Sequence, residues 1–90
     1  MTAIKVTKIS EGKYEVIVAM QTTTKHLVML SHDYYQELSR SYVSEEKLIK
    51  KSFIFLLERE SNTMILERFD LQIIGDYFPE FEEKIKRSLS

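Results

Sequence analysis

The spacing of apolar residues changes once along the chain, near Ser31, and this change most constrains the fold. Before Ser31, apolar and polar residues alternate with period two, as in strands with one buried face. After Ser31, apolar residues recur at the spacing of amphipathic helices. Strands followed by helices are typical of an α+β fold. We expect one domain over residues 1–90, with strands over about 3–31 and helices over about 33–89.

The strand region predicts a three-stranded antiparallel β-meander. The first strand carries Ile4, Val6 and Ile9. The uneven step to Ile9 predicts a bulge or an early strand end near Lys8. Turn residues at 10–13 then lead into a second strand with alternating apolar residues.

The third strand follows a threonine-rich reversal of the chain. Thr22–Thr24 lacks the Gly or Asn of a tight hairpin turn, so we expect the reversal near residues 23–25. Successive residues of the third strand point to opposite faces. One face carries Leu27 and Met29, and the other carries His26, Val28 and Leu30.

The remaining chain predicts three to four helices packed on one face of the sheet. Ser31 or Asp33 can cap a short helix over 34–39, and Ser44 can cap a main helix that runs to about Glu60. We then expect another helical turn or two from Thr63 to Phe69. Asp70 can cap residues 71–74, and Pro79, whose φ suits a first helical position, opens a last helix over 80–87.

Ile54 interrupts the charged face of the main helix. At helical spacing its neighbours are Lys47, Lys50, Lys51 and Glu58. One interpretation is a single exposed apolar residue, which is normal on soluble proteins. The other makes Ile54, helped by Phe55, a contact with a second subunit or with the C-terminal helix.

Aromatic residues gather around Pro79 near the C-terminus. They pack the last helix onto the domain, or they form an exposed docking surface, because aromatic side chains beside a proline make rigid anchors. With the main helix, they complete a set of possible interface residues: Ile54, Phe55, Lys50, Lys51, Tyr77, Phe78 and Phe81.

Composition and charge exclude several functions. The chain has no cysteine, which removes disulfides, thiol catalysis and Cys-ligated zinc and fits a cytoplasmic protein. No apolar run approaches the roughly 18 residues of a membrane span. With 13 basic and 14 acidic residues the net charge is −1, so the whole molecule has no long-range attraction for nucleic acid.

Catalytic and metal-binding patterns are absent from the sequence. His32 and Asp33 are adjacent, but only His26 adds a second histidine, so no recognised ligand set forms. Ser31, His32 and Asp33 are consecutive and cannot converge as a nucleophilic triad. Glu58, Glu60 and Glu67 are expected to be solvated carboxylates. We therefore expect no cofactor, no metal and no enzymatic activity.

Residues 25–60 resemble the ribbon-helix-helix fold of small bacterial repressors and antitoxins. The resemblance rests on a strand, a short helix starting near Asp33 and a second helix opening Val43-Ser44-Glu45-Glu46. It implies that two protomers pair strands into a ribbon that enters the major groove, with Ser44 near a phosphate. The outward strand face would be Lys25, Leu27, Met29 and Ser31, or His26, Val28 and Leu30.

The chain as a whole is similar to small uncharacterised bacterial proteins with a Thr-rich hairpin, a Phe-Leu-Leu-Glu-Arg-Glu helix and a Tyr-Phe-Pro-Glu-Phe ending. This similarity implies no activity. Both candidate ribbon faces are mainly apolar, and Glu45 and Glu46 place negative charge where a phosphate would bind. We therefore expect a non-catalytic interaction or regulatory module that binds a protein partner or itself as a homodimer. A ribbon-helix-helix DNA-binding protein is the alternative, and a small enzyme is a second one.

Overall fold

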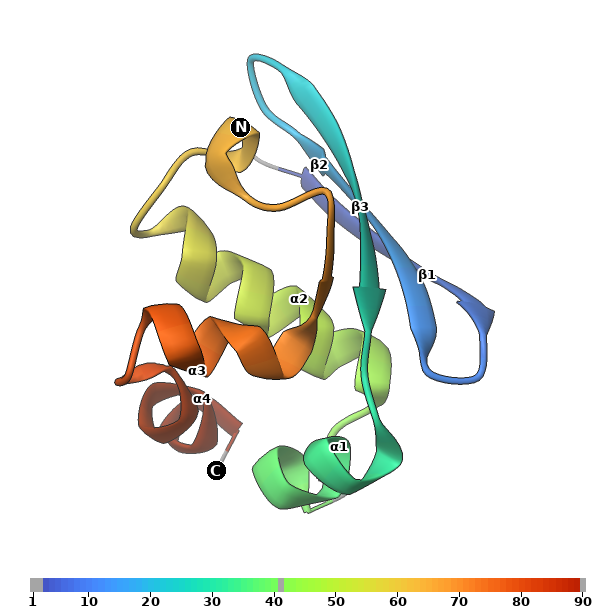
Figure 1. Cartoon of the computed structure of the whole chain (residues 1–90), viewed down its shortest axis with the longest axis vertical. Helices are drawn as coiled ribbons and strands as arrows, with labels where there is room; N and C mark the ends of the chain where they lie inside the picture. Colours follow the sequence, from blue (N-terminus) through green and yellow to red (C-terminus); the bar gives the residue numbers. More distant parts are fainter. Residues whose placement is uncertain (1–2, 41, 90) are drawn as a thin grey trace.

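The chain folds with strands first and helices second, apart from one short strand near residue 69 (Figure 1). The computed structural model describes residues 3–40 and 42–89. The strands are β1 (Ala3–Ser10), β2 (Lys13–Ala19), β3 (Thr23–Met29) and β4 (Arg68–Asp70). The α-helices are α1 (His32–Ser39), α2 (Glu45–Leu57), α3 (Ile74–Tyr77) and α4 (Phe81–Leu89), with 3-10 turns η1 (Asn62–Met64) and η2 (Leu71–Ile73). The α+β class is confirmed.

The sheet has four strands in the order β1-β2-β3-β4, not the three antiparallel strands expected. The first three form the predicted meander, but β4 pairs parallel with β3 through Leu27↔Arg68 and Val28↔Phe69. The prediction of helical turns from Thr63 to Phe69 is wrong beyond η1. The chain forms an extended strand here instead of a helix because the strand gives the amide of Leu27 an acceptor, Glu67 O at 2.7 Å, and buries Phe69.

The hairpin details are partly as expected. The register between β1 and β2 shifts between Lys8 and Ser10, which confirms the bulge. The second reversal lies at residues 20–22, before the expected 23–25, and β3 already begins at Thr23. Asn62 explains the difference, because its side-chain amide donates to Thr22 O at 2.7 Å and thereby holds the turn from 40 residues away.

Side-chain caps begin the helices where the sequence places them. Ser31 Oγ accepts from Tyr34 N, and Ser44 Oγ accepts from Lys47 N, both at 3.1 Å. Ser31, not Asp33, thus caps α1. The helix α2 ends at Leu57, before the expected Glu60.

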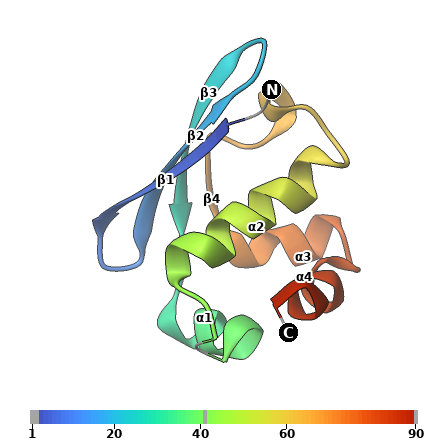
Figure 2. The same ribbon diagram turned by 180° about the vertical axis from the view of Figure 1, so that it is seen from behind.

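The helices all lie on one face of the sheet, as Figures 1 and 2 show. Their apolar faces meet the inward residues of β2 and β3, among them Tyr14, Val16, Val18, His26 and Val28, all nearly inaccessible. The helix α2 packs against β1, and α4 packs on α1 and α2. This arrangement leaves the far side of the sheet and the outer edge of β1 uncovered by the described helices. Across the described ranges, no helix has the length and apolar character needed to cross a membrane.

Candidate interaction surface

Ile54 is an exposed apolar residue in the middle of the outer face of α2. Its side chain is 46% exposed, and its neighbours one turn away, Lys50 and Glu58, are also exposed. The opposite face of α2 is buried against the sheet, and this burial fixes Ile54 toward solvent. The structure therefore presents an apolar side chain framed by opposite charges.

A shallow groove of about 460 Å³ lies between Ile54 and the edge of the sheet. It is lined by Ala3, Ile4, Lys50, Ile54, Leu57 and Glu58. Ile4 and Leu57 pack partly against the core and leave the rest of their apolar surface facing the groove. We call these six residues, with the outer edge of β1, the β1–α2 surface.

The outer edge of β1 supplies backbone groups to the same surface. Within the part of the chain that the structure describes, β1 pairs with β2 alone. In an antiparallel strand every second residue directs its N–H and C=O away from its neighbour, so an edge strand can pair with another chain. Lys8 has an ion pair with Glu11 at 2.9 Å, and this hydrogen bond raises the pKa of Lys8. Lys5 and Lys8 place positive charge along β1.

A second groove, of about 250 Å³, lies on the other side of Ile54 toward α4. Ile54, Phe55 and Glu58 line it from α2, and Lys84, Ile85 and Ser88 line it from α4. Lys51, which is half-buried, completes the lining. Ile54 thus stands on a ridge between two hollows, one beside β1 and one beside α4.

Phe55 and Phe81 lie inside the molecule, as the alternative that packs the last helix onto the domain predicts. Phe55 is 4% exposed and Phe81 is fully buried. The ring of Phe55 lies 5.1 Å from that of Phe81 and 5.9 Å from that of Phe78, in edge-on geometry. Such aromatic packing stabilises a core. Phe55 is buried because α4 returns onto α2 and covers it. This packing is the contact with the C-terminal helix that was one of the two alternatives for Phe55.

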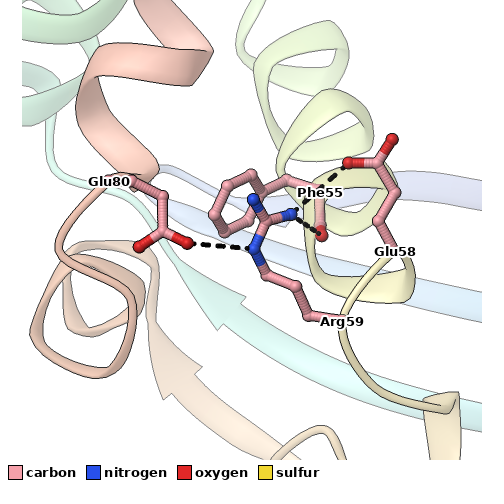
Figure 3. A network of polar contacts seen from close by, with 4 residues as sticks. All are labelled: Phe55, Glu58, Arg59 and Glu80. Atoms are coloured by element: carbon pink, nitrogen blue, oxygen red, sulfur yellow. Dashed lines mark hydrogen bonds and ion pairs between the residues drawn. The ribbon is translucent and has the colours of Figure 1, made fainter.

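Arg59 closes the outside of this aromatic cluster, as Figure 3 shows. It donates to Phe55 O at 3.0 Å and to Glu80 Oε2 at 3.3 Å. A backbone hydrogen bond at Glu80 itself, and then the hydrogen bond from Arg59, lower the pKa of the Glu80 carboxyl. The contacts of Arg59 with Phe55 and Glu80 therefore stabilise the fold.

A third groove, of about 320 Å³, was not foreseen. Met64, Leu66 and Tyr77 line it and are 70%, 45% and 64% exposed, and the half-buried Phe78 lines it too. Tyr77 was among the expected interface residues. The sequence did not indicate Met64 and Leu66, because a helix over Thr63–Phe69 would place these two side chains on different faces.

The histidines have separate structural surroundings. The ring of His26 is buried, with Nδ1 2.7 Å from Leu66 O and Nε2 2.9 Å from Thr24 Oγ1. His32 is exposed at the start of α1. Over residues 3–40 and 42–89, no group of three His, Cys, Asp or Glu residues is arranged to hold a metal ion.

Two buried tyrosines hold carboxylates at helix starts. Tyr14 Oη donates to Glu45 at 2.6 Å, and Tyr34 Oη donates to Glu82 at 2.9 Å. Burial, and then the hydrogen bond to the carboxylate, raise the pKa of both hydroxyls. Both tyrosines are therefore neutral, and the first turn of α2 carries a carboxylate fixed by the sheet.

The residues implied by the ribbon-helix-helix resemblance lie in a different setting. The strand β3 has β2 on one side and β4 on the other, so both of its edges are occupied over residues 27–29. Lys25, Leu27 and Met29 point away from the helices, and His26 and Val28 point into the core. Ser44 caps α2, next to the Glu45 carboxylate that Tyr14 holds.

The fold and this surface define a class: a small α+β domain with helices on one sheet face and an open edge strand beside an exposed helix. Compared with protein-family models, curated proteins and solved structures, the chain has no match in any of the three. The two resemblances drawn from the sequence stay predictions.

Proposed function

We propose that this protein is a small non-catalytic module of the cytoplasm that acts by binding protein, and that it self-associates through the β1–α2 surface. One observation carries the proposal: Ile54, 46% exposed between charged neighbours, lies beside the open edge of β1. An apolar anchor and an unpaired strand edge are two features that protein partners use, and here they share one surface.

The apolar content of the surface supports association of modest strength. Burying the exposed part of Ile54, with the accessible parts of Ile4 and Leu57, contributes on the order of 1–3 kcal/mol at about 25 cal/mol per Å². Strand pairing along β1 adds backbone hydrogen bonds to this. The polar rim of Lys50 and Glu58 matches the usual anatomy of an interface, with an apolar centre and charged surroundings.

The non-catalytic part of the proposal rests on the kind of side chains that line the grooves. Apolar residues form most of the lining of the grooves of about 320 and 460 Å³, beside the ionisable groups Glu60, Lys50 and Glu58. Acid–base or nucleophilic catalysis needs polar groups that converge on one point with matched pKa values. The tyrosines with raised pKa values face carboxylates inside the fold and not a groove.

Nucleic-acid binding is the second candidate, and one observation favours it. The uncovered face of the sheet carries Lys5, Lys13, Lys25 and Arg68 against Glu15 and Asp70, so it is more basic than the molecule as a whole. Lys25 lies 3.9 Å from Glu15, which reduces this excess. Binding of a labelled DNA duplex at low salt that weakens steeply with added salt would support this candidate.

Light scattering over a range of protein concentrations tests the proposed function. We expect the wild-type mass to rise from monomer to dimer, and Ile54→Glu to remain a folded monomer because it places a charge at the centre of the surface. Leu66→Glu is the matched control, since Leu66 is 45% exposed and lies on the third groove. A wild-type protein that stays monomeric at millimolar concentration contradicts self-association.

A further inference from the structure

We infer that the partner at the β1–α2 surface is a second copy of this chain, docked antiparallel across a two-fold axis, with Lys50 of each copy facing Glu58 of the other. This inference rests on the proposed function and adds the geometry of the pair. It follows from the order of charges along α2 and from the direction of α2 relative to β1.

Lys50, Ile54 and Glu58 form one row along the exposed face of α2, because residues four apart lie above one another on a helix. The row reads positive, apolar, negative. In an antiparallel second copy the row reads negative, apolar, positive. Each lysine then meets a glutamate and the two Ile54 side chains meet at the axis, whereas a parallel copy sets like charges against each other. The row is therefore self-complementary in the isologous sense.

The charges in this row are available for contacts between copies. Lys50 makes no ion pair among the residues that the structure describes. Glu58 has an ion pair with Arg59 at 3.4 Å, and its side chain is 67% exposed. Such surface pairs contribute little and exchange readily.

The same axis can also pair the two β1 edges. The start of α2 lies beside the Lys8 end of β1, because Tyr14 pairs with Lys8 and binds Glu45. The end of α2 lies beside Ala3 and Ile4. The helix thus runs opposite to β1, and both lie on the near side of the molecule in Figure 2. A two-fold axis perpendicular to the sheet therefore makes both the strand pair and the helix pair antiparallel.

The geometry also restricts the strand register. A two-fold axis perpendicular to the sheet keeps each side chain on the same face of the joined sheet. Because residues directly opposite each other in an antiparallel pair share a face, the residue at the axis must lie opposite the same residue of the other copy. An axis at Lys5 would set two like charges opposite each other, which destabilises a strand pair. An axis at Ile4, which lines the same groove as Ile54, sets Lys5 opposite Ala3 and joins the two sheets through the first residues of β1.

Charge reversal tests the arrangement with four proteins and one matched control. Lys50→Glu alone and Glu58→Lys alone each create two like-charge contacts between copies. We expect each to raise the dimer dissociation constant at least tenfold at low salt. An equimolar mixture of the two variants, and the double variant Lys50→Glu/Glu58→Lys, restore opposite charges at both contacts. We expect both to return to within about threefold of the wild type. Lys86→Glu, on the exposed face of α4, should leave the constant unchanged.

The outcomes separate the inference from the proposed function. A wild-type dimer whose dissociation constant is unaffected by the single reversals overturns the antiparallel geometry but leaves self-association intact. A mixture that binds more tightly than the wild type, with single and double variants that bind as the wild type does, also overturns it, because a parallel pair, with like charges opposite each other in all but the mixture, behaves in that way. A wild type that is monomeric at every concentration overturns both. Circular dichroism of each variant confirms that it is folded.

Discussion

The guanidinium group of Arg59 lies over the ring of Phe55, with its central carbon 3.6 Å from the ring centroid. The same group bonds Phe55 O and Glu80, so it joins the end of α2 to the turn before α4. A cation held over an aromatic ring with little solvent contact contributes on the order of 0.5–2 kcal/mol. The side chain of Arg59 is 21% exposed, which places it in this range.

Replacement of Arg59 by methionine should lower the free energy of unfolding by about 1–2 kcal/mol, because the cation–π contact and the bond to Phe55 O are lost together. Urea denaturation measures this change. Arg87→Met is the comparison: Arg87 forms an ion pair with Glu83 at 2.7 Å, but both side chains are largely exposed. Equal losses in the two variants would contradict the structural role of Arg59.

Asn62 should be among the most sensitive polar positions. Its buried side chain donates to Thr22 O at 2.7 Å, Thr24 Oγ1 at 3.0 Å and Val18 O at 3.4 Å. Asn62→Ala leaves these acceptors without their donor, so we expect a loss of about 2–3 kcal/mol. Faster hydrogen exchange in the turn over 20–22 should accompany it. The exposed neighbour change Thr63→Ala serves as the control, and a loss as large there would contradict this role.

The buried tyrosines predict how stability changes at high pH. Their pKa values are raised in the folded protein, whereas an unfolded tyrosine ionises near pH 10. The unfolded state therefore loses protons first, and stability is fully present below about pH 10 and falls as pH rises further. Urea midpoints between pH 8 and 11.5 should fall less steeply in Tyr14→Phe/Tyr34→Phe, although this variant starts lower. If the urea midpoint fell equally steeply with pH in the wild type and in this variant, the result would contradict the raised pKa values of the two tyrosines.

Local signals in the sequence predicted most of the elements. The period-two pattern gave β1, β2 and β3, and Ser31 and Ser44 marked helix starts that the structure confirms by direct hydrogen bonds. Helical spacing also placed Ile54 on the exposed face of α2. These features depend on residues within a few positions of one another, which is why the sequence alone reveals them.

The missed features depend on residues far apart in the chain. The strand β4 spans only Arg68–Asp70, too short for any period to show, and it forms because β3 offers an open edge. Asn62 fixes a turn 40 residues away. The burial of Phe55 depends on the packing of α4 against α2. No local pattern contains this information, because tertiary contacts override local propensity.

Hydrogen–deuterium exchange of the β1 amides at two protein concentrations tests the central claim most directly. At low concentration the outward amides of β1 face solvent and should exchange fast. If two copies pair through the β1–α2 surface, these amides and residues 50–58 should become protected at high concentration in the wild type but not in Ile54→Glu. Exchange over β1 that is fast and independent of concentration, in a protein that forms dimers, would contradict this surface as the interface.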